Sequence, residues 1–127
     1  MERAVEVFAI INFVVIGLSH AFQPHAWVDF FVVLRERGHA GVFAAAFLAL
    51  WFGSIVVAFH NVWTGIPIVL TLIGWGQVLK ALIYFVFPSF GLRQLQRPSH
   101  DRAYQFVYGG VFFLVLAGLL SYHLLTA

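Results

Sequence analysis

Four long apolar runs constrain this chain more than any other feature of its sequence. A helix needs roughly 20 mostly apolar residues to cross a hydrocarbon layer about 30 Å thick. Four segments meet that requirement: 4–22, 40–61, 65–87 and 104–125. The runs are continuous rather than alternating, which favours helices over membrane strands. The sequence therefore predicts an all-α polytopic membrane protein, a four-transmembrane-helix bundle that forms one domain over 1–127.

The composition excludes the main water-soluble classes. Hydrophobic residues make up 62% of the chain and charged residues 9%, whereas a soluble domain is about 25% charged. So few charges cannot cover a soluble globule, and disordered or nucleic-acid-binding chains are excluded for the same reason. The absence of cysteine excludes a disulfide scaffold.

Residues 24–38, between the first two runs, are too short and too charged to span a membrane. Pro24 suits the first turn of a new helix, and Asp29 interrupts the apolar residues. We expect an interfacial helix that lies along the bilayer surface. The alternative is that this segment continues the first helix out of the membrane.

The arginines predict the orientation of the chain. Only Arg3 lies on the side of the termini. The loops after the first and third spans, which share the other side, contain five arginines: Arg35, Arg37, Arg93, Arg97 and Arg102. Because cytoplasmic loops of membrane proteins carry an excess of positive residues, both termini are expected on the outer side.

Small residues recur at every fourth position of the second run, at Gly41, Ala45, Ala49 and Gly53. This spacing places them on one helix face and lets another backbone approach closely. We expect the face to pack within the monomer, with contact between protomers as the alternative.

Polar residues inside the runs indicate where a ligand or solute path would lie, because such residues are costly in hydrocarbon. Lys80 is the first candidate, about eight residues before Pro88, and Gln77 and Tyr84 lie on the same helix face. Snorkelling of Lys80 to the membrane surface is the alternative interpretation. Asn12 would line the middle of the path and His60 its mouth.

Glu6, His60 and His123 are expected near the outer ends of three different helices. If those helices adjoin, the three side chains could form a metal site, a proton relay or a pH-sensitive cluster. The alternative is three separate polar residues that face water or lipid headgroups. His60 and His123 could also ligate haem at matched depth.

No motif of a known enzyme class occurs in the sequence, so we expect no catalytic residue and predict no cofactor. One pattern resembles small uncharacterised bacterial integral membrane proteins: His60-Asn61-Val62-Trp63, Pro67, Thr71, Gly74-Trp75, Lys80 and Phe87-Pro88. The resemblance implies a protein of the bacterial inner membrane and transfers no activity.

These features predict a small homo-oligomeric channel or transporter for an ion or small polar solute. An oligomer is expected because four helices enclose little space. The first alternative is a non-catalytic accessory subunit of a larger respiratory, photosynthetic or transport complex. The second is a redox subunit that binds quinone or haem through His60 and His123.

Overall fold

The computed structural model describes residues 1–126, and within that range every regular element is a helix. The elements are α1 (Glu2–Phe22), α2 (Pro24–Glu36), α3 (His39–Phe59), α4 (Ile68–Val86), α5 (Pro88–Leu95), the 3-10 turn η1 (His100–Arg102) and α6 (Tyr104–Thr126). Helices α1, α3, α4 and α6 are long and apolar enough to cross a membrane. The prediction of an all-α chain with four such helices is confirmed.

Prolines determine where several helices begin and end. Pro24 disfavours the helical conformation at Gln23, whose φ is −130° and ψ 54°, so α1 ends there and α2 is a separate helix. Pro88 has the same effect on Phe87 and ends α4. Pro88 then begins α5, a short helix that we did not anticipate from the sequence. The third predicted span, 65–87, corresponds to α4, which begins at Ile68 rather than 65, because Gly65 adopts a left-handed conformation with φ 71°.

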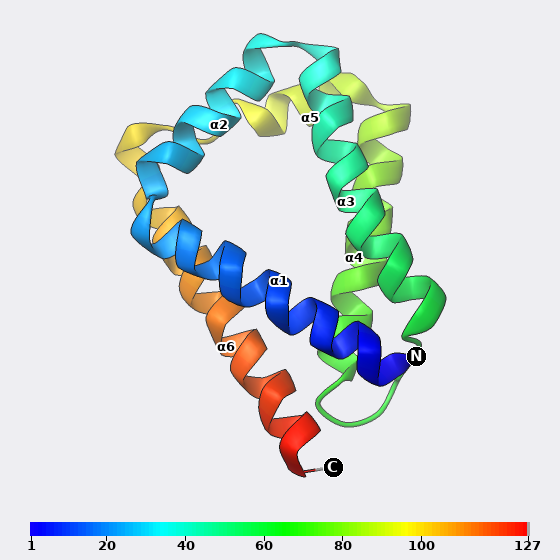
Figure 1. Cartoon of the computed structure of the whole chain (residues 1–127). Helices are drawn as coiled ribbons and strands as arrows, with labels where there is room; N and C mark the ends of the chain where they lie inside the picture. The colour runs from blue at the N-terminus through cyan, green and yellow to red at the C-terminus, as the bar shows by residue number, and fades with distance from the viewer. Residues whose placement is uncertain (127) are drawn as a thin grey trace.

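The four long helices form two antiparallel pairs, α1 with α6 and α3 with α4 (Figure 1). The pairs meet near the beginning of α1 and separate in the other direction, where α2 and α5 connect them (Figure 1). We call the first region the termini end and the second the α2–α5 end. Each of the four long helices packs mainly against the other member of its pair.

Glycines allow close approach within each pair. A Cβ atom at Gly53 of α3 would lie 2.9 Å from the Gly74 carbonyl oxygen of α4. A Cβ atom at Gly17 of α1 would lie 3.0 Å from the Gly110 carbonyl oxygen of α6. The distance at Gly53 is shorter than real Cβ contacts, and the distance at Gly17 is tighter than nine in ten of them, so a larger residue at either position would push the paired helices apart.

The small-residue face of α3 contacts other parts of the same chain. Gly41 is close to the backbone of Leu34 in α2, and Gly53 is close to α4. Ala45 and Ala49, between them, line a pocket. Within one chain, this face therefore packs against α2 and α4.

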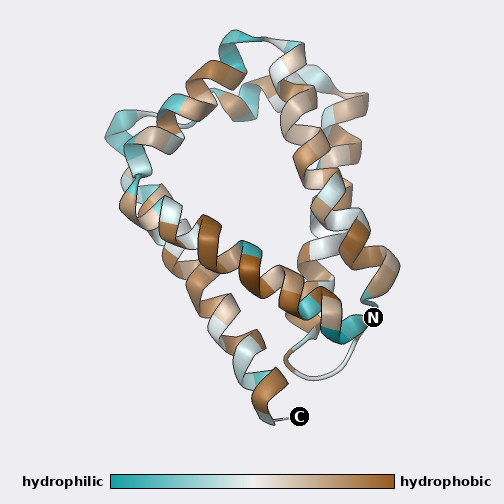
Figure 2. Ribbon diagram, viewed as in Figure 1, coloured by the Kyte–Doolittle hydropathy of each residue, from teal (hydrophilic) through white to brown (hydrophobic). Residues whose placement is uncertain are grey.

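Two apolar clusters hold the fold together. One lies at the termini end and combines residues from all four long helices, including Phe13, Val56, Leu70 and Leu120. The other lies at the α2–α5 end around Val42, Ala46 and Tyr84. Apolar residues dominate the long helices, whereas hydrophilic residues gather mainly at the α2–α5 end (Figure 2).

Candidate functional site

Four polar side chains converge at the termini end, one from each long helix or its boundary. Glu6 is in the second turn of α1, Thr71 in the first turn of α4 and His123 in the last turn of α6. His60 follows α3 directly. His60 and Thr71 are completely buried and Glu6 is 4% exposed, whereas the His123 side chain is 32% exposed. We call these residues the Glu6–His60 cluster.

Short contacts connect the cluster. Nδ1 of His60 lies 3.0 Å from Oγ1 of Thr71, and Nε2 of His60 lies 2.9 Å from Oε2 of Glu6. Nε2 of His123 lies 3.7 Å from Oε1 of Glu6. The distances indicate two hydrogen bonds on His60 and a looser contact between Glu6 and His123.

The hydrogen bonds determine where the protons of this cluster lie. The Thr71 hydroxyl donates to the Val62 carbonyl oxygen at 2.7 Å, and that oxygen can only accept. Nδ1 of His60 must therefore carry a hydrogen and donate to Thr71. One proton then lies in the remaining contact, and it is bonded either to Nε2 of His60 or to Oε2 of Glu6. The pair is either imidazole with carboxylic acid or imidazolium with carboxylate, and its net charge is zero in both forms.

Oε1 of Glu6 is buried and has no hydrogen-bond partner. A buried oxygen without a partner costs about 1–3 kcal/mol, so this atom is ready to bind a hydrogen donor. Nε2 of His123 lies 3.7 Å from this oxygen, which is beyond hydrogen-bond distance.

The cluster does not have the arrangement of a metal centre. Within residues 1–126, no group of three or more His, Cys, Asp or Glu side chains could hold a metal ion. Both ring nitrogens of His60 are occupied by Thr71 and Glu6, so ligation of haem would require one of these bonds to break. His60 is also buried, rather than facing an open mouth.

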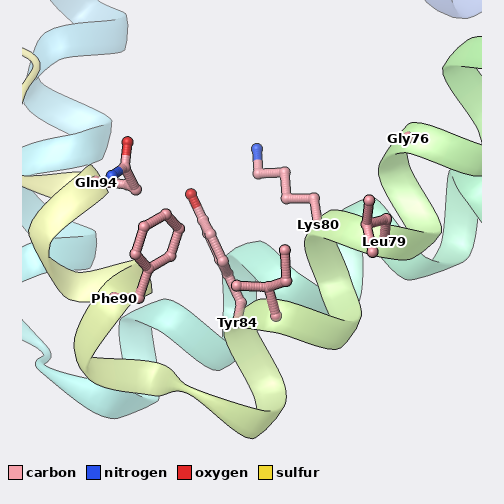
Figure 3. Close-up of a pocket in the computed structure, with 7 residues that line it drawn as sticks. Gly76, Leu79, Lys80, Tyr84, Phe90 and Gln94 are labelled. Carbon is pink, nitrogen blue, oxygen red and sulfur yellow. The ribbon is translucent and has the colours of Figure 1, made fainter.

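A second polar feature, the Lys80 pocket, lies toward the α2–α5 end. The pocket has a volume of about 270 Å³ and is lined by Gly76, Leu79, Lys80, Ile83, Tyr84, Phe90 and Gln94. The polar ends of Lys80, Tyr84 and Gln94 point toward the same opening, and the Phe90 ring lies beside Tyr84 (Figure 3). The Lys80 ammonium is 5.5 Å from the centre of the Tyr84 ring, a cation–π distance.

Lys80 also lines an adjacent pocket of about 210 Å³, between α4, α3 and α2. Gln77 and Trp27 are among the residues around this second pocket. The predicted group of Gln77, Lys80 and Tyr84 is therefore divided between two pockets, and Lys80 belongs to both.

Asn12 is not part of either polar feature. Its side-chain amide donates to the Phe8 carbonyl oxygen of its own helix at 2.8 Å. The structure therefore gives Asn12 a bond within α1 rather than to a neighbouring helix.

The α2–α5 end has a third polar group, which is exposed. Nδ1 of His25 lies 2.8 Å from Nδ1 of His100, and Nε2 of His100 lies 3.1 Å from Oδ1 of Asp29. Nearby, Arg35 donates to the Pro98 carbonyl oxygen at 3.0 Å. These bonds attach α2 to the segment that precedes α6.

Sequence reasoning missed the roles of Thr71, Phe90 and Gln94, and it did not anticipate the exposed group of His25, His100 and Asp29. Thr71 is the partner that orients His60, and Phe90 and Gln94 complete the Lys80 pocket. A polar residue in the first turn of an apolar helix was the available signal for Thr71. Phe90 and Gln94 lie on α5, which we did not anticipate.

No protein-family model, curated protein or solved structure matches this chain.

Chemically, the Glu6–His60 cluster can hold and exchange protons, and the Lys80 pocket can hold a small anion or hydrogen-bond acceptor.

Proposed function

We propose that this protein is a small membrane transporter or channel that carries a small anionic solute. The observation that carries the proposal is the environment of Lys80. Lys80 is a residue of an apolar helix, its exposed side chain lines an open pocket, and no carboxylate among residues 1–126 forms an ion pair with it. A cation within a membrane span costs several kcal/mol unless it finds water or a counter-ion. A passing anion would provide that counter-ion.

The other groups around Lys80 support an anionic solute. The Tyr84 hydroxyl and the Gln94 amide can donate hydrogen bonds from the same side as the Lys80 ammonium (Figure 3). The remaining lining is apolar and aromatic. A volume of about 270 Å³ lies just below the range of drug-sized ligand sites, which suits a solute of few atoms.

The proposed setting is the bacterial inner membrane, with the termini end outside. The arginines of α2, α5 and the following segment support this orientation, because they gather at the α2–α5 end. In this orientation α2 and α5 lie along the cytoplasmic surface. Lys80 is six residues before the end of α4, which is about 9 Å along the helix axis.

A second copy of the chain would complete the path. The Lys80 pocket is open on one side, and many large apolar residues of α3 and α4 are exposed, including Trp51, Leu72 and Leu79. Native mass spectrometry of the extracted protein should give a homo-oligomer. A larger partner subunit in the same particle would instead favour an accessory role.

Substitution of Lys80 by methionine tests the proposal in proteoliposomes that contain a chloride-sensitive fluorophore, with chloride as the probe and nitrate and acetate as anions that exchange with it. We expect anion flux to fall roughly 10- to 100-fold, because a hydrogen bond from a charged donor contributes about 1.5–3 kcal/mol. Lys80→Arg should retain most of the flux. Arg102→Gln, which removes one positive charge outside the pocket, is the matched control. Equal flux in Lys80→Met and the unaltered protein would refute the proposal.

The chain offers a direct test of whether the pocket contains water, because Lys80 is its only lysine. A membrane-impermeant, amine-reactive ester should label Lys80 in liposomes that contain the protein in both orientations. Mass spectrometry separates this label from that on the terminal amine, and Lys80→Arg should remove it. Labelling that requires detergent unfolding would mean that lipid, rather than water, surrounds Lys80.

A further inference from the structure

The Glu6–His60 cluster lies far from Lys80 along α4, and the proposed solute path does not use it. The cluster joins the two helix pairs, because Glu6 and His123 come from α1 and α6, while His60 directly follows α3 and Thr71 lies in α4. Buried ionisable residues in membrane proteins are costly and commonly serve proton or ion pathways. The cluster therefore needs an explanation of its own.

We propose that Glu6, His60, Thr71 and His123 form a proton-binding site that takes up one proton from water at the termini end. His123 is the entry point, since it is the partly exposed member and lies 3.7 Å from the unpartnered Oε1 of Glu6. Thr71 positions His60 by accepting a hydrogen bond from Nδ1.

Without the extra proton, the neutral form of the pair is favoured: Oε2 of Glu6 carries the proton and donates to Nε2 of His60. Separated charges are expensive at a buried site, and the carboxylate would have only one partner there. His123 is neutral in this state and makes no hydrogen bond to Glu6.

Proton uptake changes only N–H and O–H bonds. One proton from water binds the free ring nitrogen of His123, which becomes an imidazolium. Its Nε2–H moves by less than 1 Å toward Glu6 and donates to Oε1, which now has a partner. The carboxylate is then stabilised, and the proton on Oε2 passes to Nε2 of His60. The loaded site has one carboxylate between two imidazolium groups, and it has gained one proton.

No other titratable group competes for Glu6. His60 and His123 are its only ion-pairing partners among residues 1–126. α4 contributes Thr71, which does not titrate, and α6 contributes the exposed Tyr122 beside His123. On α1 itself, the Met1 amine, Glu2 and Arg3 are exposed.

The test measures the protonation of histidine rings rather than solute flux. Its outcome therefore does not depend on whether the protein transports a solute. The protein, labelled with ¹⁵N in its histidine rings, is placed in lipid nanodiscs, and the ring-nitrogen shifts are followed against pH. Nδ1 of His60 should remain protonated throughout. Nε2 of His60 should change from acceptor to N–H at the pH where His123 titrates.

Two variants decide the outcome. In His123→Asn, the change at Nε2 of His60 that coincides with titration of His123 should be lost. In Glu6→Gln, any remaining change at Nε2 of His60 should no longer occur at the pH where His123 changes. Glu2→Gln, on the same helix, is the control and should behave like the unaltered protein. If the His60 curve in His123→Asn superimposes on that of the unaltered protein, the proposal is wrong. Because His123 lies at the surface, this variant gives an answer even if Glu6→Gln fails to fold.

Discussion

Replacing His60 with leucine should lower the free energy of unfolding by about 3–5 kcal/mol, the range found when one member of a buried pair is removed. Glu6 is 4% exposed and hydrogen-bonds only to His60, so the variant leaves its carboxyl group without a partner. The Thr71 hydroxyl also loses the hydrogen that it accepts from Nδ1. Detergent-solubilised protein can be unfolded with increasing SDS while helical circular dichroism is recorded.

A double variant separates the cost of an unpaired group from the loss of a favourable bond. Glu6→Leu combined with His60→Leu replaces both partners by apolar groups, which is often neutral or stabilising. The double variant should therefore be more stable than His60→Leu alone. His39→Leu, at an exposed histidine of α3, is the matched control and should change stability by less than about 0.5 kcal/mol. A double variant less stable than the single one would show that the pair itself stabilises the fold.

The long helices could be predicted from the sequence because membrane spans depend on a local property. A run of about 20 apolar residues can cross the hydrocarbon layer as a helix, whatever packs beside it. Pro24 and Pro88 end helices through their own backbone geometry. The short helix α5 was missed because its eight residues contain polar and apolar residues without a long run. Its hydrophobic residues, such as Leu95, acquire their role only by packing on α3 and α4.

The Glu6–His60 cluster was anticipated only as one of several alternatives. Glu6, His60 and His123 are far apart in the sequence, and no spacing rule brings three helices together. These three residues lie close together only because α1 pairs with α6 and α3 pairs with α4. The pairing in turn depends on close contacts at Gly17 and Gly53, whose partners cannot be identified from one sequence.

The Lys80 pocket, too, could be predicted from the sequence only in part. The i−3 and i+4 spacing correctly places Gln77 and Tyr84 near Lys80 along one helix. It could not show that Gln77 lines one pocket and Tyr84 another, because α2 and α5 form the remaining walls. Helix periodicity gives the face of a residue, but the partner of that face comes from tertiary packing.

Substitution of Gly53 by valine should lower the free energy of unfolding by about 1–3 kcal/mol, the usual cost of overpacking. A Cβ atom there would lie 2.9 Å from the Gly74 carbonyl oxygen, the Val78 backbone nitrogen and the Gln77 Cβ. Two of these atoms belong to the α4 backbone and cannot rotate away, so α3 and α4 must separate. The SDS titration used for His60→Leu measures the loss.

Gly118→Ala is the matched control for this substitution, since no atom lies within 4 Å of the added Cβ at this position of α6. Alanine should raise helix stability there by up to about 1 kcal/mol.

Gly53→Val should also reduce anion flux, because the displaced segment of α4 carries Gln77 and Lys80, which line the same pocket as Ala49. Unchanged stability in Gly53→Val would mean that α3 and α4 are not in contact at Gly53 and Gly74. Lost stability with unchanged flux would instead show that the packing of α3 against α4 does not affect the proposed solute path.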